Sequence, residues 1–150
     1  MELAARQRGM TFHELVTLAS ILEKETGRNA VTPEQKQSLL AERKIVAGIF
    51  YNRLEIGMAL QSDATVNYVT GKNLPSPTLE DTQVNSPYNT YKYKGLPPGP
   101  IGSPSLMSLE AASQPTASKY FYFLHDQTTG QAVYSQTFEE HVANKNRYLK

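Results

Sequence analysis

The sequence predicts an α+β fold with a helical half, a loop-rich middle and a small antiparallel β element near its end. Apolar residues recur at helical spacing up to residue 57, and two short apolar runs flank a turn after residue 119. Between them, residues 58–105 are rich in Asn, Ser, Thr, Tyr, Gly and Pro, which favour loops with short strands at most. A chain of 150 residues can bury one core, so we expect a single domain over residues 1–150.

The first helix is predicted over residues 11–26. Thr11 is a suitable N-cap, and Glu14 completes a capping box three residues later. Gly27 is the expected C-terminal stop, because a glycine just beyond the last apolar residue commonly ends a helix.

A second helix is predicted from the N-cap Thr32 to Gly57. Pro33 suits its first turn, because proline lacks the N–H that is unsatisfied there. We expect one break in this helix near Ser38. Its buried stripe is predicted to consist of Leu39, Leu40, Ile45, Val46, Ile49, Phe50 and Leu54.

The last third of the chain predicts a short helix, a hairpin and a terminal helix. The short helix is expected over residues 105–113, before Pro115. Two strands then flank a turn at residues 128–130. The terminal helix is expected to begin at Thr137, which has a capping-box partner in Glu140.

The loop-rich middle contains Tyr68, Tyr88, Tyr91 and Tyr93. This density of aromatic residues argues against disorder, because disordered segments are poor in them. The rings could belong to the core or to a binding surface. The segment GLPPGPIGSPS (95–105) could likewise be a rigid connection or the wall of a site.

Composition excludes several function classes. The net charge of +1 provides no electrostatic footprint for nucleic acid or an anionic membrane surface. The chain has no cysteine, and His13, His125 and His141 lack metal-ligand spacing, so no metal or other cofactor is predicted. No apolar run reaches the roughly 18 residues of a membrane span, and we expect any export or membrane-anchoring segment to lie outside this sequence.

Two glutamates end the first helix in the stretch TLASILEKETG (17–27). Glu25 continues the apolar face, which consists of Leu15, Leu18, Ile21 and Leu22. Glu23 lies on a flank with smaller and more polar neighbours. A carboxyl against apolar side chains is desolvated, and desolvation raises its pKa, so Glu25 is the better candidate acid. The alternative is an ordinary solvated helix end.

Four separated stretches together carry a family resemblance. They are LASILEKETG (18–27), IFYNRLEIGMALQSDATVNY (49–68), NSPYNTYKYKGLPPGPIGSPSLMSLEAA (85–112) and YFYFLHD (120–126). In this order they resemble the catalytic domain of the endolytic murein transglycosylase family, also called MltG or YceG-like. The connection over residues 27–42 is longer than in many relatives, so that surface could be specific to this protein.

The resemblance implies endolytic cleavage of the β-1,4 bond between N-acetylmuramic acid and N-acetylglucosamine in peptidoglycan strands, leaving 1,6-anhydro ends. The second glutamate of the family's EKE block is catalytic, and it corresponds to Glu25. One carboxyl would act first as acid and then as base, without a cofactor. The resemblance also implies action at the extracytoplasmic face of the bacterial cell membrane, with peptidoglycan synthases or divisome proteins as candidate partners.

The other family blocks supply candidate substrate-binding residues. Asp63 could orient sugar hydroxyls, stabilise positive charge at the reacting carbon or merely cap a turn, and its block assigns it to binding or electrostatic support. Amides, hydroxyls and rings suit sugars because they combine directional hydrogen bonds with stacking. The candidate residues are Gln61, Ser62, Asp63, Thr65, Asn89, Thr90 and Tyr91, with Leu96 and Pro97 as a stiff wall.

Two other functions compete with the transglycosylase. A hydrolytic muramidase would use water and leave reducing ends. It generally needs a second carboxyl, and the sequence offers none as persuasive as Glu25. A non-catalytic glycan-binding or scaffold module would bind strands without cleaving them.

Overall fold

The computed structural model describes residues 1–149 and confirms the α+β class. Its elements are α1 (Glu2–Gln7), α2 (Phe12–Glu25), α3 (Pro33–Glu55), α4 (Asp63–Thr70), the 3₁₀-helix η1 (Asp81–Gln83), α5 (Leu106–Ser113), β1 (Tyr122–His125), β2 (Ala132–Ser135) and α6 (Phe138–Tyr148).

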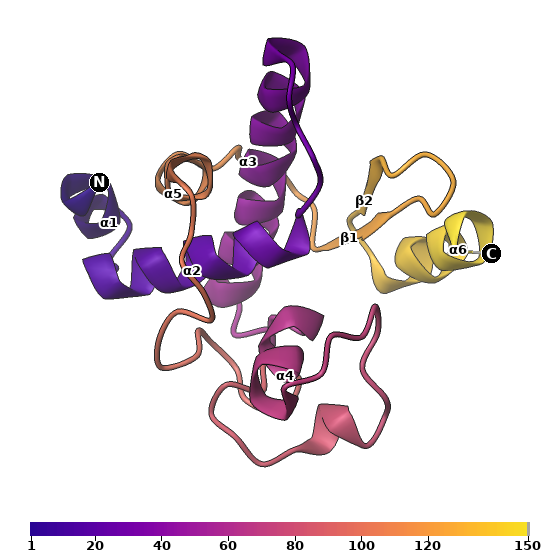
Figure 1. The fold of residues 1–150 in the computed structure, drawn as a ribbon. Helices are drawn as coiled ribbons and strands as arrows, with labels where there is room; N and C mark the ends of the chain where they lie inside the picture. Colours follow the sequence, from indigo (N-terminus) through magenta and orange to yellow (C-terminus); the bar gives the residue numbers. More distant parts are fainter. Residues whose placement is uncertain (150) are drawn as a thin grey trace.

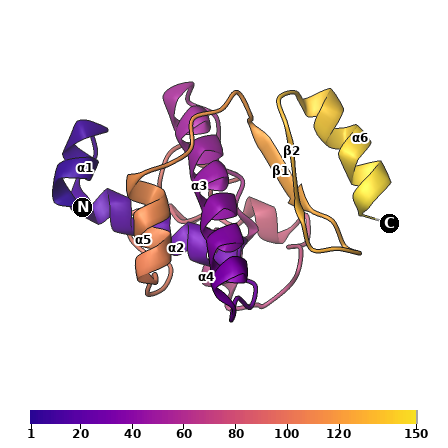
Figure 2. The same ribbon diagram turned by 90° about the horizontal axis from the view of Figure 1, so that it is seen from above.

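Helices α2 and α3 cross at the centre of the molecule (Figure 1). Helices α1 and α5 lie on one side of this crossing, and α5 packs against both α2 and α3. The β hairpin and α6 lie on the other side, as the view from above also shows (Figure 2). Helix α4 and the loops of the middle segment pack against the end of α2.

The two ends of α2, with the N-cap Thr11 and the C-cap Thr26, match the predicted bounds of residues 11–26. Thr11 Oγ1 accepts the N–H of Glu14, whose carboxylate accepts the N–H of Thr11, which is the predicted capping box. The helix ends at Glu25 with Thr26 as C-cap, because the Thr26 hydroxyl donates to the Leu22 carbonyl at 2.7 Å. Gly27 therefore lies beyond the cap.

Helix α3 is continuous from Pro33 to Glu55, so the predicted break near Ser38 is wrong. Thr32 caps the helix with Gln35 as its capping-box partner. Ser38 is exposed, and its hydroxyl accepts a hydrogen bond from Arg28 at 3.3 Å instead of competing with the helix backbone.

Helix α4 was not predicted, since residues 58–105 were expected to hold only loops and short strands. It begins after Ser62 and ends at Gly71, which has a φ of 71°. Its β-branched residues have modest helix propensity, but Thr65 and Val66 are fully buried. Tertiary packing therefore outweighs local propensity here. The separate helix α1 was also missed.

The predicted hairpin and terminal helix are confirmed. Strands β1 and β2 pair antiparallel, with Phe123 opposite Tyr134 and His125 opposite Ala132. The Phe123 ring meets the Phe50 ring of α3 edge-on at a centroid distance of 5.9 Å. This contact fixes the hairpin against the helical half.

The core consists of apolar side chains from the crossing helices and the segments that cover them. Its members include Leu15, Leu18, Ile21 and Leu22 of α2, Val46 and Phe50 of α3, Ala111 and Ala112 of α5, and Leu60. Gly48 lies where the chain after α5 crosses α3, and a Cβ there would approach the Thr116 carbonyl oxygen to 2.1 Å. Glycine is therefore required for this close approach.

Candidate active site

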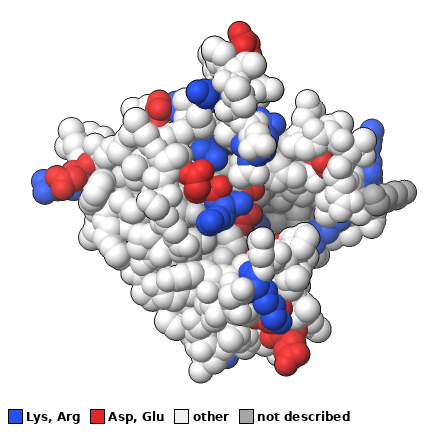
Figure 3. Space-filling model, viewed as in Figure 1, with Lys and Arg blue, Asp and Glu red and all other residues white. Residues whose placement is uncertain are grey.

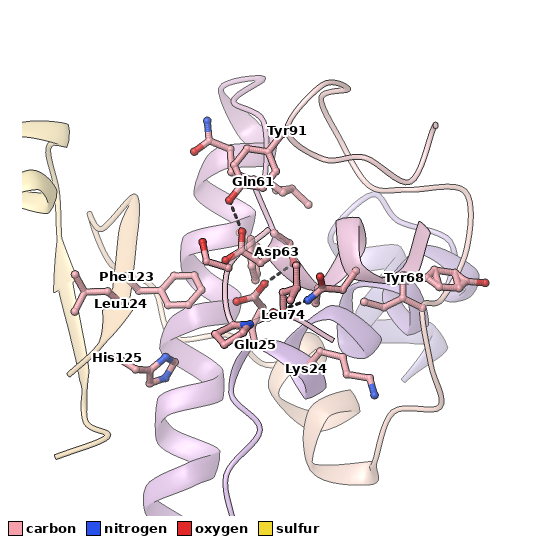
Figure 4. A pocket seen from close by; sticks show the side chains of 18 of the residues that line it. Lys24, Glu25, Gln61, Asp63, Tyr68, Leu74, Tyr91, Phe123, Leu124 and His125 are labelled. Atoms are coloured by element: carbon pink, nitrogen blue, oxygen red, sulfur yellow. Dashed lines mark hydrogen bonds between the residues drawn. The ribbon is translucent and has the colours of Figure 1, made fainter. Parts of the chain in front are cut away.

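A cavity of about 950 Å³ lies where α2 ends, between α4 and the β hairpin (Figure 4). On the face viewed in Figure 3 this region is hollowed, and acidic and basic side chains are interspersed around it. The residues that line the cavity include Glu25, Arg53, Gln61, Ser62, Asp63, Tyr68, Leu74, Tyr91, Phe123 and His125. The cavity therefore joins the helical half to the loop-rich middle and the hairpin.

Glu25 is the last residue of α2 and points into this cavity. Burial raises the pKa of its carboxyl above the usual value, and the negative charge of Asp63 acts in the same direction. A hydrogen bond from Ser62 Oγ at 2.5 Å, a backbone hydrogen bond from Ala64 and the nearby His125 oppose the shift without cancelling it. Glu25 therefore holds its proton more readily than an exposed glutamate.

Ser62 reaches Glu25 because of its place at the start of α4. It is the N-cap residue of that helix, but its hydroxyl donates to Glu25 and makes no capping hydrogen bond. The preceding residue, Gln61, has a φ of 52°, in the left-handed region that costs a non-glycine residue roughly 1–2 kcal/mol. Backbone strain of this kind clusters at functional sites.

Asp63, the first residue of α4, is held by Tyr91. The Tyr91 hydroxyl donates to Asp63 Oδ1 across the cavity (Figure 4). Burial and this hydrogen bond to an anion raise the pKa of Tyr91 above its usual value. The tyrosine therefore remains a neutral donor, and Asp63 remains an acceptor beside Glu25.

Glu23 has a different environment from Glu25. Its Oε1 accepts the Ser105 N–H at 2.6 Å, and its Oε2 lies 3.0 Å from Arg43 Nη2. Burial alone would raise the pKa of Glu23, but the hydrogen bonds from Ser105 and the charge of Arg43 outweigh it and lower the pKa. Glu23 is therefore a structural carboxylate that joins α2 and α3 to the start of α5.

Several residues predicted as substrate contacts are buried outside the cavity lining. Thr65, Asn89 and Thr90 are at most 1% exposed. Thr90 Oγ1 accepts the Ser62 N–H at 2.9 Å and lies 2.8 Å from Thr65 Oγ1. Thr65 and Thr90 therefore connect the start of α4 to the loop around residue 90 and position Ser62, whereas Asn89 holds that loop by donating to the Thr82 and Val84 carbonyls.

Leu96 and Pro97 also lie away from the cavity lining. Leu96 packs against the core, and Pro97 is buried. The adjacent Pro98 carbonyl lies 2.7 Å from His13 Nε2, which ties this segment to the start of α2. This part of the segment 95–105 therefore connects over the helical half, whereas Ile101 of the same segment lines the cavity.

The part of the chain that the structure describes contains no cluster of three His, Asp or Glu side chains that could hold a metal ion. Within the same residues, no helix is both long and apolar enough to cross a lipid bilayer.

A family model described as the YceG-like family matches residues 1–147. The chain belongs to the YceG-like family. This agrees with the resemblance inferred from the sequence blocks.

Individual YceG-like relatives support the same membership. The protein named endolytic murein transglycosylase from Bacillus subtilis is 38% identical over 96% of this chain, and its Streptococcus pneumoniae namesake is 38% identical over 93%. A crystal structure of a YceG-like protein from Listeria monocytogenes matches 93% of the chain with a TM-score of 0.81 and 42% identity. The chain spans 37%, 24% and 42% of these proteins, respectively.

Sequence reasoning missed the cavity residues contributed by α3 and the hairpin of this YceG-like chain. Arg53 lies at the cavity, where its guanidinium donates to the carbonyls of Leu60 and Phe121 at 2.9 and 2.7 Å. Phe123 and His125 face the cavity from β1. Arg53 and His125 lie inside the NRL and YFYFLHD blocks of the sequence. No local pattern indicates that these two residues line the same cavity as Glu25.

Proposed function

We propose that the cavity is the catalytic site of an endolytic peptidoglycan transglycosylase and that Glu25 is its acid and base. The observation that carries this proposal is the environment of the Glu25 carboxyl. This carboxyl faces the cavity, its pKa is raised, and it accepts a side-chain hydrogen bond from Ser62. A carboxyl of this kind is suited to donating a proton near neutral pH. The names of the Bacillus and Streptococcus relatives support the reaction class.

In the proposed reaction, Glu25 donates its proton to the oxygen that links N-acetylmuramic acid to N-acetylglucosamine. The bond between C1 and this linking oxygen breaks, and N-acetylglucosamine leaves with a C4 hydroxyl. The resulting Glu25 carboxylate takes the proton of the muramic acid C6 hydroxyl while the C6 oxygen bonds to C1, which leaves a 1,6-anhydro end. The nucleophile belongs to the substrate, so the step gains the entropic advantage of an intramolecular reaction. No enzyme nucleophile is needed.

Other residues that line the cavity are proposed to support this step. The Asp63 carboxylate could stabilise positive charge that develops at C1, and the Tyr91 hydroxyl fixes its orientation. Gln61, Ser62, Asp63 and Tyr91 line the cavity and are proposed to contact the glycan. Thr65, Asn89, Thr90, Leu96 and Pro97 are proposed to act indirectly, by holding these loops.

The proposed substrate supports an activity outside the cytoplasm. Murein is the glycan of the cell wall, so we propose that residues 1–150 act at the extracytoplasmic face of the membrane as one catalytic domain. Peptidoglycan strands are the proposed partner. An association with synthases or divisome proteins follows from the family resemblance alone.

The decisive experiment compares wild type and Glu25→Gln on purified peptidoglycan, with products analysed by mass spectrometry. The natural full-length protein is used together with residues 1–150. Wild type should produce internal cleavage with 1,6-anhydro ends, and Glu25→Gln should lose cleavage while retaining glycan binding, because the amide keeps the shape but exchanges no proton. Glu23→Gln is the matched control and should still cleave.

Other outcomes would select a different function. Reducing ends in place of anhydro ends would indicate a hydrolytic muramidase. Glycan binding without cleavage by the full-length wild type would indicate a binding or scaffold module. Wild-type activity of Glu25→Gln would remove Glu25 from its proposed role.

A further inference from the structure

Helix α3 contains a buried carboxyl that the proposed reaction does not use. Glu42 is 6% exposed. Its Oε1 lies 3.4 Å from His125 Nε2, and its Oε2 lies 3.9 Å from Arg28 Nε. Oε2 has no hydrogen-bond partner within residues 1–149. Burying a carboxylate destabilises the folded protein unless the carboxylate is paired. We therefore ask what its pairing with His125 does for the cavity.

His125 connects this buried carboxyl to the cavity. It is the last residue of β1 and lines the same cavity as Glu25, on the side opposite Tyr68 (Figure 4). Phe123, two residues earlier, also lines the cavity, and its ring meets the His125 ring edge-on at 6.1 Å. The imidazole is therefore held between a buried carboxylate and the cavity that contains the proposed acid.

We propose that His125 is a second functional side chain of this cavity and that Glu42 is its positioning residue. The inference rests on the proposed function, because the role of His125 is defined relative to Glu25. In its protonated form, His125 stabilises the Glu25 carboxylate that exists after the glycosidic oxygen has received its proton. His125 transfers no proton in this role, so the proton balance of the reaction is unchanged.

The electrostatics of the cavity support this assignment. His125 is among the groups that oppose the raised pKa of Glu25. The charged and titratable groups that pair with this site or line the cavity with His125 are Glu42 and Arg53 from α3, Arg28 from the connection before α3, Lys24 and Glu25 from α2, Asp63 and Tyr68 from α4, Lys72 and Tyr91 from the loops of the middle segment, and His141 and Lys145 from α6. Asp63 acts on Glu25 in the opposite direction, by raising its pKa. His125 and Asp63 therefore act in opposite directions on the pKa of Glu25, in addition to the larger effects of burial and the Ser62 hydrogen bond.

The first test is the pH dependence of cleavage by the full-length protein carrying His125→Gln. Removing the imidazole should raise the pKa of Glu25, so the alkaline limb of the rate profile should move to higher pH. The plateau kcat should fall about tenfold, because a carboxyl with a higher pKa is a weaker acid, while KM changes less. Glu42→Gln should show the same changes to a smaller extent. His13→Gln, which alters a histidine outside the cavity, is the matched control.

A second measurement does not require cleavage. The Glu25 side-chain carboxyl, labelled with ¹³C, is titrated by NMR in wild type and in His125→Gln, and the midpoint should rise in the variant. An unchanged midpoint, or a wild-type pH profile and kcat in His125→Gln, would overturn the inference. If Glu42→Gln does not fold, the partly exposed His125 decides the outcome alone. Failure of the proposed function would instead appear as a lack of anhydro products from wild type.

Discussion

Glu23 and Glu25 are two residues apart on α2, yet the protein shifts their pKa values in opposite directions. Glu23 accepts hydrogen bonds from the start of α5 and pairs with Arg43, so its charged form is favoured. Glu25 faces a cavity with Asp63 nearby, so its neutral form is favoured. Glu25 therefore has the environment that the proposed proton transfer requires, whereas Glu23, two positions earlier on the same helix, supports the structure.

The raised pKa of Glu25 predicts a stability effect with a definite sign. A carboxyl whose folded pKa exceeds its unfolded value stabilises the protein at low pH and loses that contribution as pH rises through the folded pKa. The Glu25→Gln variant has no charge to bury. Its melting temperature should therefore match wild type near pH 4 and exceed it increasingly towards neutral pH. Parallel melting curves at all pH values would contradict a raised pKa.

Substitutions of Tyr91 test whether its ring and hydroxyl contribute to glycan binding and cleavage. Tyr91→Ala should weaken binding of a murein oligosaccharide and reduce cleavage, with a smaller loss of stability than the roughly 3–5 kcal/mol of a core aromatic. Tyr91→Phe should retain most of the affinity but reduce cleavage, because Asp63 loses its donor. Calorimetry and thermal melting measure both quantities.

Tyr93→Ala is the control for these variants, since Tyr93 is 42% exposed and does not line the cavity. A large drop in melting temperature for Tyr91→Ala, with unchanged affinity per folded molecule, would make Tyr91 a core residue instead.

At the level of elements, the Glu23 carboxylate joins α2, α3 and α5. Glu23→Gln should destabilise the protein by about 1–2 kcal/mol at neutral pH, because the buried Arg43 loses its charged partner. A carboxyl whose pKa is lowered by folding stabilises the protein at pH values above its unfolded-state pKa. This contribution is lost as the pH falls through the folded-state pKa. The difference in melting temperature from wild type should therefore shrink in acid. Its sign is opposite to that of Glu25→Gln, because Glu23→Gln is the less stable protein at neutral pH and Glu25→Gln the more stable one. A loss of cleavage per folded molecule would move Glu23 into the catalytic site.

Helix α3 depends on the absence of a side chain at Gly48. Alanine normally favours a helix interior by about 1 kcal/mol over glycine, but its Cβ would collide with the Thr116 backbone, which is held by its N–H bonding to the Lys44 carbonyl at 3.0 Å. Overpacking of this kind costs about 1–3 kcal/mol, so Gly48→Ala should lower the melting temperature by several degrees. Gln37→Ala, in the exposed part of α3, should not. A stabilised Gly48→Ala would show that the segment after α5 moves freely.

At the scale of the whole molecule, the proposed reaction depends on proton transfer by one carboxyl in a shaped cavity and on no metal ion. Within residues 1–149, no three potential ligands gather to hold a metal, and transfer by one carboxyl requires no Lewis acid. Cleavage by the full-length protein should therefore survive exhaustive chelation. Activity lost in EDTA and restored by one specific divalent ion would refute the single-carboxyl chemistry.

Much of this architecture could be predicted from the sequence because its signals are local. The capping box at Thr11, the N-cap Thr32 with Pro33, the short helix expected from residue 105 and the two strands expected around a turn correctly indicated where α2, α3, α5 and the β element begin. Helical periodicity also placed Glu25 on the apolar face and Glu23 beside it, which made Glu25 the candidate acid. Each of these inferences depends on residues within about one or two turns of each other.

Tertiary structure alone decided which side chains surround that candidate acid. Ser62, His125 and Arg53 come from segments far apart in sequence, and only packing brings them to one cavity with Glu25. The same long-range packing buried Thr65, Asn89 and Thr90 behind the cavity wall and formed α4 despite weak local propensity. The pKa of a carboxyl depends on burial and on every nearby charge. Local sequence therefore indicated Glu25 as the candidate acid. The pKa of its carboxyl is instead determined by contacts that no local sequence pattern encodes.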